Sequence, residues 1–110
     1  MELSIGDPWF EFIKFGKKRY EGRKASDKLK ELKKGDIIKL VHHTGLSLLV
    51  KIIDIHSFPT FEDGLKVLPL LKTLPSINTV DEGVEVYKKY VKLETQKTFG
   101  VLFFEIEVID

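Results

Sequence analysis

The sequence contains no cysteine, only two arginines and no long hydrophobic run. Without cysteine the protein has no disulfide, no thiolate metal site and no cysteine nucleophile, and such a chain suits a reducing compartment. Apolar stretches such as Val101 to Phe104 are far too short to span a bilayer. Residues 1–5 lack the basic start and the apolar run of a signal peptide. We therefore expect a cytoplasmic protein, or a nuclear one in a eukaryote, with no membrane partner.

The 110 residues, of which 43% are hydrophobic and 32% charged, fit a single domain over residues 1–110. The formal net charge is only +1, but the charges are unevenly distributed. With 11 Lys and Arg against 4 Asp and Glu, residues 14–39 carry a net charge of +7, and the remainder carries −6. Such a basic segment attracts phosphates, although a charge run is more often a solvated surface.

Helix signals occur at several places. Asp7-Pro8 is a typical helix start, because aspartate caps free amides and proline fits the first turn, and Gly16 is a typical helix end. Thr79 and Glu82 form a capping box before an apolar pattern with helical spacing. We expect helices over residues 7–15, 26–32, 60–68 and 79–91, and a further short element between Pro69 and Pro75.

Runs rich in apolar and β-branched residues predict strands over residues 3–5, 17–24, 37–43, 48–55 and 101–109. The third and fourth runs form a hairpin, and their incomplete alternation suggests burial on both faces. The last run alternates, with its apolar residues inward, namely Leu102, Phe104, Ile106 and Val108. The predicted fold is α+β: a small β-barrel of five or six strands with flanking helices.

Both arginines fall within one eight-residue segment, Gly16-Lys17-Lys18-Arg19-Tyr20-Glu21-Gly22-Arg23. A guanidinium group offers phosphate or carboxylate a planar fork that lysine lacks. In an extended chain Arg19, Glu21 and Arg23 share one face. A turn at residues 16–18 would bring Lys18 to the same side. The spacing also fits a surface ion-pair ladder on a strand, so binding and structural roles both remain open.

The fixed positions Gly16, Lys18, Glu21 and Arg23 match the motif GxKxxExR, and the chain resembles the ASCH family (activating-signal-cointegrator homology). Other features follow in the family's order, namely an apolar helix before the motif, Gly35-Asp36, Ser57-Phe58, Tyr87-Lys88-Lys89-Tyr90 and Gly100-Val101. The resemblance implies a fold similar to PUA domains. It also implies a cleft beside the first helix that takes RNA or a modified nucleoside.

We expect a binding site for RNA, a nucleotide or a nucleoside that comprises Gly16, Lys17, Lys18, Arg19, Tyr20, Glu21, Arg23 and Tyr90. The resemblance also implies that some relatives are enzymes: one branch deacetylates acetylated cytidine and another cleaves single-stranded RNA. In the deacetylating branch a threonine nucleophile occupies the position of Glu21. A glutamate there would instead act as a general base beside Lys18. The candidates for that branch's second acidic residue are Glu82 and Glu85.

The histidines and several aromatic residues are further candidates, for metal binding and for base stacking respectively. His42 and His43 would point to opposite faces of a strand and His56 is isolated, so we expect no metal site. We expect no cofactor either. The aromatic residues available to stack on bases are Trp9, Tyr20, Tyr87 and Tyr90, although core packing is favoured for Trp9 in its apolar helix.

Three functions are consistent with these residues. In the first, a binding module, phosphates meet the basic residues of the motif segment and a base enters near Glu21. In the second, a hydrolase of an acylated nucleoside or single-stranded RNA, Glu21 is the base and Lys18 stabilises negative charge. In the third, a protein-interaction domain, the motif is only an ion-pair network. Convergence of Lys18, Glu21 and Arg23 on an open pocket would favour the first two.

Overall fold

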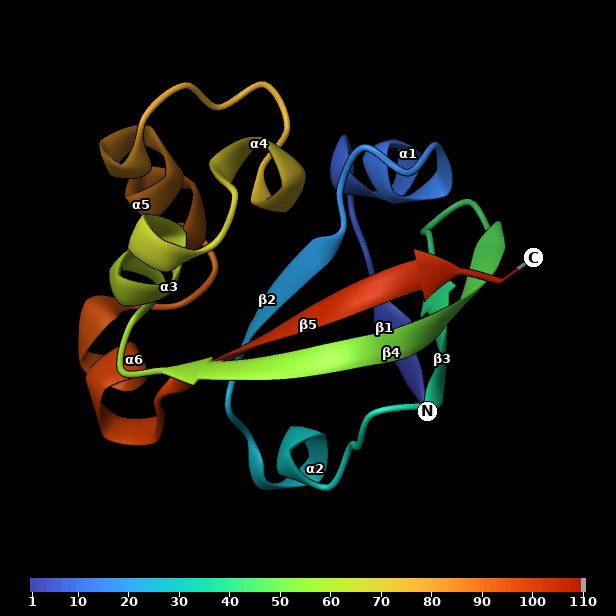
Figure 1. The fold of residues 1–110 in the computed structure, drawn as a ribbon, viewed down its shortest axis with the longest axis horizontal. Coiled ribbons are helices and arrows are strands. Elements are labelled where there is room, and N and C mark those ends of the chain that lie inside the picture. Colours follow the sequence, from blue (N-terminus) through green and yellow to red (C-terminus); the bar gives the residue numbers. More distant parts are fainter. Residues whose placement is uncertain (110) are drawn as a thin grey trace.

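A computed structural model describes residues 1–109, which form five strands and six helices (Figure 1). The strands are β1 (Glu2–Ser4), β2 (Tyr20–Lys24), β3 (Ile37–Val41), β4 (Ser47–Phe58) and β5 (Val101–Val108). The helices are α1 (Trp9–Lys14), α2 (Asp27–Lys30), α3 (Phe61–Val67), α4 (Leu70–Thr73), α5 (Val80–Lys88) and α6 (Leu93–Phe99).

The five strands form one sheet in the order β1-β3-β4-β5-β2, which makes β1 and β2 its edges. The β1–β3 pair is parallel and the other three pairs are antiparallel. The register shifts between Ile52 and Asp54 in the long strand β4, and such bulges increase the bend of a strand. The sheet curls into a half-barrel, so the α+β, barrel-like fold predicted from the sequence is confirmed.

Two hydrophobic clusters hold the fold together. The first lies inside the curled sheet and includes Phe10, Ile38, Val50 and Phe104. The second joins helices α3 and α5 to β5 and is centred on Phe103, against which Phe61 and Tyr87 pack edge-on. Both faces of β5 are therefore buried. Leu102, Phe104 and Ile106 face the inner cluster, as predicted.

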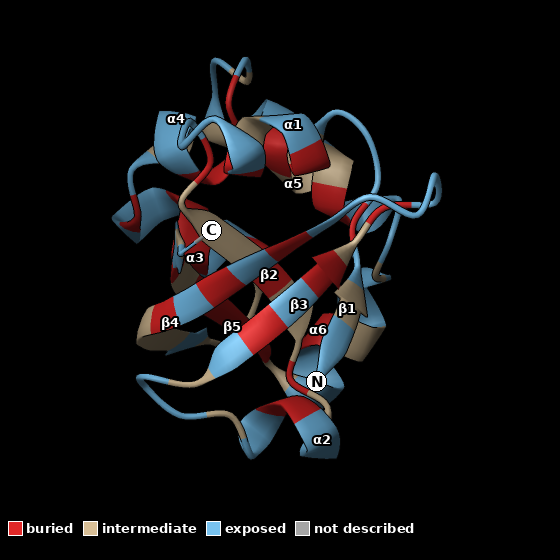
Figure 2. Ribbon diagram, turned by 90° about the vertical axis from the view of Figure 1, so that its right-hand side faces the viewer, coloured by how far each residue is buried: buried red, intermediate tan, exposed pale blue. Residues whose placement is uncertain are grey.

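Two of the predicted details are wrong. Asp7 does not cap α1; its Oδ1 lies 2.8 Å from Nε2 of His42 instead. Strands β3 and β4 alternate between buried and exposed residues along the hairpin (Figure 2), so Ile37 and Leu49 face solvent and are not buried. The capping box of α5 is present, because Thr79 Oγ1 accepts a hydrogen bond from Glu82 N.

Helix α6 was not predicted, because it lacks an apolar stripe. Its only large apolar side chains, Leu93 and Phe99, are exposed, and its buried residue is Gln96. The Gln96 side chain accepts a hydrogen bond from Phe61 N and donates one to Val91 O. A polar side chain with two backbone partners thus docks the helix, and hydrophobic periodicity does not reveal such a contact.

Candidate ligand-binding site

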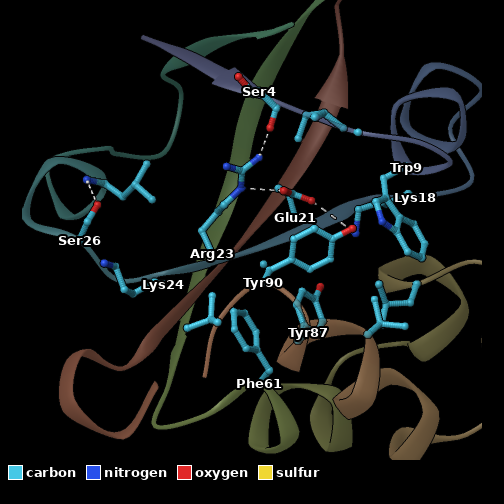
Figure 3. A pocket seen from close by; sticks show the side chains of 17 residues that line it. Ser4, Trp9, Lys18, Glu21, Arg23, Lys24, Ser26, Phe61, Tyr87 and Tyr90 are labelled. Atoms are coloured by element: carbon cyan, nitrogen blue, oxygen red, sulfur yellow. Dashed lines mark hydrogen bonds and ion pairs between the residues drawn. The ribbon is translucent and has the colours of Figure 1, made fainter. Parts of the chain in front are cut away.

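A cavity of about 370 Å³ opens at the free edge of β2, where the two hydrophobic clusters meet (Figure 3). Its walls come from the end of β1, from α1, β2 and α2, and from the segment around α5. Its polar and aromatic lining residues are Ser4, Trp9, Lys18, Glu21, Arg23, Lys24, Ser26, Phe61, Tyr87 and Tyr90. Lys18, Glu21 and Arg23 therefore converge on one pocket.

A sharp turn after α1 brings Lys18 into the protein. Gly16 adopts φ +76°, a conformation that glycine accepts without the steric cost of a side chain. The backbone amides of Lys17 and Lys18 both donate to Phe12 O, at 2.8 and 3.0 Å. The chain then enters β2 with the Lys18 side chain inward, where only 3% of the residue is exposed.

The Lys18 ammonium is held entirely by protein groups. Nζ donates to Tyr20 O at 2.7 Å and to Thr73 O, and lies 3.5 Å from Glu21 Oε1. It also lies 5.5 Å from the centre of the Trp9 ring. Burial lowers the pKa of Lys18, and the Glu21 carboxylate opposes part of that shift. Because an ammonium has three donors, these three partners leave Lys18 little capacity for a phosphate.

Arg23 and Glu21 continue the network towards β1. Arg23 Nε donates to Glu21 Oε2 at 2.8 Å, and Arg23 Nη2 donates to Ser4 O at 2.7 Å (Figure 3). The Arg23 side chain is 27% exposed. Since a guanidinium has five N–H donors, three remain for water or a ligand at the cavity.

The opposite wall is aromatic. The Tyr87 ring stacks on Phe61, with centroids 4.1 Å apart, and its hydroxyl is buried without a hydrogen-bond partner. Burial raises the pKa of Tyr87 well above its ordinary value, and the Glu21 carboxylate adds to the rise. Tyr87 therefore stays a neutral phenol. Tyr90, which follows α5, is 67% exposed and lines the same cavity.

Gly22 separates these two walls. A Cβ atom at this position would lie 2.7 Å from Phe103 Cε1 and 2.8 Å from Tyr87 Oη. Any side chain would therefore displace the Tyr87 phenol or the Phe103 ring, and only glycine lets α5 pack this closely on β2.

The structure does not bring every predicted site residue into the cavity. Gly16 and Arg19 line a separate hollow of about 270 Å³ beside Phe15, and Lys17 is exposed outside both. The Tyr20 ring packs near His56, with centroids 6.0 Å apart, and does not line the cavity.

The two glutamates of α5 do not reach the cavity either. Glu82 contacts Thr79 at the start of the helix, and Glu85 forms an ion pair with Lys88. Among the described residues that line the cavity, Glu21 is the sole acidic one. The structure therefore supplies no second carboxylate from α5 for a two-acid mechanism.

The prediction that His42 and His43 point to opposite faces of a strand is wrong. Strand β3 ends at Val41, so His42 and His43 lie in a turn, with ring centroids 4.1 Å apart. Potential ligand atoms of these two residues and Asp7 lie within 4.8 Å of one another. Both nitrogens of His42 already have partners, Asp7 Oδ1 and Thr44 Oγ1.

His56 is not isolated, because a second group of potential metal ligands surrounds it. Its Nε2 lies 3.9 Å from Asp54 and 3.8 Å from Glu105. All three side chains are partly exposed, and Asp54 also pairs with Lys34 and with its neighbouring backbone amide.

None of the helices in residues 1–109 has the length and apolar character that a membrane crossing requires.

Comparison with known proteins identifies the fold. The hypothetical protein PH0355, known from a crystal structure, is 35% identical, with a TM-score of 0.87 over 99% of this chain and 100% of its own. Protein PF0455 from Pyrococcus furiosus is 30% identical, with a TM-score of 0.76 over 100% of this chain and 99% of its own. Protein EF3133 from Enterococcus faecalis, at 15% identity, shares the fold alone, with a TM-score of 0.64 over 91% of this chain and 66% of its own.

No curated protein matches the chain. The model of the ASCH domain, in contrast, matches residues 3–110. That match covers nearly the whole sequence and includes the segment that holds Lys18, Glu21 and Arg23. The chain therefore belongs to the ASCH domain family.

Proposed function

We propose that this ASCH domain binds single-stranded RNA by holding one nucleobase in the cavity beside β2. The observation that carries the proposal is the cavity itself, in which aromatic walls meet the Lys18–Glu21–Arg23 network. Its volume of about 370 Å³ lies in the range of roughly 300 to 1,000 Å³ typical of small-ligand sites. The most basic part of the chain, residues 14–39, supplies β2 and the start of α2 around it.

Tyr90 supports the entry of a base. It is a largely exposed aromatic residue on the cavity lining, and the hydrophobic clusters do not include it. Trp9 offers a second ring inside, near the Lys18 ammonium. Proteins that bind single strands stack bases on such rings, with about 1 to 3 kcal/mol lost when one is replaced by alanine.

The charges favour a phosphate at the rim and not on the floor. Lys18 is enclosed and bonded to protein groups, and the Glu21 carboxylate would repel an anion placed beside it. Lys24 and the unused donors of Arg23 line the cavity nearer to solvent. Lys17 and Arg19, outside the cavity, are available to flanking nucleotides.

A binding experiment with two aromatic variants tests this function. Short labelled single-stranded RNA is titrated with the protein at low salt, and fluorescence anisotropy gives the affinity. Tyr90→Ala should weaken binding by about fivefold or more. Phe15→Ala is the matched control, since Phe15 is equally exposed (69%) but lies beside the other hollow. Equal affinities for the two variants, or no binding by the unaltered protein, would contradict the proposal.

A hydrolase is the second candidate, because one observation favours it. A buried lysine with a lowered pKa beside a carboxylate is common in active sites, and Lys18 with Glu21 has this arrangement. Glu21 would accept a proton from water, and Lys18 would stabilise the developing negative charge. Incubation with acetylated cytidine and with labelled RNA tests this activity. Turnover that survives Glu21→Gln undiminished would exclude the proposed role of Glu21.

A further inference from the structure

The backbone of Gly22 faces away from its neighbouring strand. At one end of the β2–β5 ladder Ile106 N donates to Arg19 O, and beyond its other end Ala25 N donates to Gly100 O. Along an antiparallel strand, every second residue directs its N–H and C=O to the same neighbouring strand, and the residues between direct theirs to the other side. Odd-numbered residues from 19 to 25 therefore bond to β5, and the N–H and C=O of Gly22 point to the free edge that lines the cavity.

Along this edge Gly22 is the residue with neither its N–H nor its C=O bonded. Tyr20 O accepts from Lys18 Nζ at 2.7 Å, and Lys24 O accepts from Ser26 N at 2.9 Å. Within residues 1–109 no such hydrogen bond caps Gly22, although the residue is buried. Buried backbone groups without partners are rare and costly.

The Tyr87 hydroxyl adds a third unsatisfied group at the same place. Its oxygen lies beside Gly22, at 2.8 Å from where a Cβ would be, and it is buried without a partner. The Gly22 backbone lies close enough to lower the pKa of Tyr87 slightly, although burial raises it by more. The Gly22 N–H nevertheless makes no hydrogen bond with Tyr87 Oη. One wall thus carries one acceptor, Gly22 C=O, and two donors, Gly22 N–H and Tyr87 O–H.

We infer that Gly22 and Tyr87 bind the hydrogen-bonding edge of the nucleobase. This inference rests on the proposed function and identifies the part of the ligand that enters. Bases present neighbouring donors and acceptors on their exposed edges, which single-strand binders read directly. A phosphate offers only acceptors and would face the C=O of Gly22 and the carboxylate of Glu21. The base therefore enters with its edge towards β2, while its phosphate stays near Lys24.

An extended peptide fits this edge poorly. Addition of a strand needs a row of free backbone donors and acceptors, and here Lys18 occupies the C=O of Tyr20 while Ser26 N occupies that of Lys24. Only Gly22, between them, offers both a free acceptor and a free donor. A small planar ligand with adjacent donor and acceptor matches that length.

Nuclear magnetic resonance of ¹⁵N-labelled protein tests the inference at Gly22. The probes are the monophosphates of uridine, cytidine, adenosine and guanosine at low salt. The Gly22 amide proton should move downfield and exchange more slowly with solvent as the best-binding nucleotide is added. The Ala25 amide, already bonded to Gly100 O, is the internal control and should change little. Binding that perturbs Tyr90 but leaves the Gly22 amide unchanged would overturn the inference while the proposed function survives.

Tyr87→Phe tests the hydroxyl with the ring kept in place. Loss of one hydrogen bond should weaken the best-binding nucleotide by roughly 2- to 10-fold. Tyr20→Phe is the matched control, because its hydroxyl lies outside the cavity. Unchanged affinity in Tyr87→Phe would remove Tyr87 from the recognition set. Absence of binding by the unaltered protein would overturn both the inference and the proposed function.

Discussion

Arg23 donates from Nη2 to the main-chain oxygen of Ser4 at 2.7 Å, and this contact joins the two edge strands of the sheet. The half-barrel is closed at this seam by one side chain and not by a backbone ladder. The same guanidinium holds Glu21 at 2.8 Å. The residues that line the cavity therefore also stabilise the fold, so a substitution here affects stability as well as binding.

Arg23→Lys should destabilise the domain by about 1 to 2 kcal/mol, because an ammonium on a flexible stem cannot keep both Glu21 and Ser4 O in a planar fork. Urea unfolding followed by circular dichroism measures this difference. Arg19→Lys is the matched control, since Arg19 lines the other hollow and not the cavity. Equal unfolding midpoints for Arg23→Lys and the unaltered protein would show that the seam needs no guanidinium.

Lys18→Met should be far more damaging than the same change one residue earlier. It removes the donor to Tyr20 O and Thr73 O and leaves Glu21 with one cation fewer. Removing one partner of a buried ion pair costs about 3 to 5 kcal/mol. Lys17→Met, at an exposed position, should change stability by less than about 0.5 kcal/mol. Chemical unfolding of the two variants gives the comparison.

The lowered pKa of Lys18 also predicts a pH dependence. Folded Lys18 holds its proton less tightly than the unfolded chain, whose lysine keeps the ordinary value of 10.5. At pH values between the folded and the unfolded pKa, the unfolded state binds more protons, so the contribution of Lys18 to stability rises with pH. The cost of burying the charged lysine is greatest at pH values below both pKa values. The free energy of unfolding of the protein minus that of Lys18→Met should increase as the pH approaches 10.5 from below. A flat or falling difference would mean that burial does not lower this pKa.

The local part of the site could be predicted from the sequence. The helix end at Gly16 and the positions of Lys18, Glu21 and Arg23 depend on residues close in the sequence. The preference for glycine at a helix end and the alternation of side chains along a strand therefore predict them. Such local rules also explain why β5 and the start of α5 were predicted well. The barrel-like class followed from the number and spacing of the strands.

The rest of the cavity depends on packing between distant segments. The helical spacing of Tyr87 in the sequence predicts only that it is buried. The position of its unpaired hydroxyl beside Gly22 depends on how α5 packs against β2. The same holds for Asp7, whose carboxylate pairs with His42 in place of its own helix end. The sequence places Tyr20 in the motif segment, but its position on β2 directs the ring towards His56.

Tyr87→Phe should stabilise the ligand-free protein. The buried hydroxyl has no hydrogen-bond partner, so the folded protein bears the cost of desolvating it. Phenylalanine removes that cost and keeps the ring contacts. We expect a gain of about 1 kcal/mol, or a rise in the melting temperature of roughly 4 to 8 °C for a domain of this size. Differential scanning calorimetry measures it, with Tyr20→Phe as the control. A fall in melting temperature would show that the hydroxyl has a partner in solution.

The salt dependence of RNA binding should identify Lys24 as a phosphate contact. Each phosphate neutralised on a single strand contributes about 0.7 to the slope of log affinity against log salt concentration. Lys24→Gln should reduce that slope by about this amount, because Lys24 lines the cavity rim. Lys51→Gln, on the exposed outer face of β4, should leave the slope unchanged. If both variants keep the full slope, the phosphate lies elsewhere, and Lys17 and Arg19 become the next residues to replace.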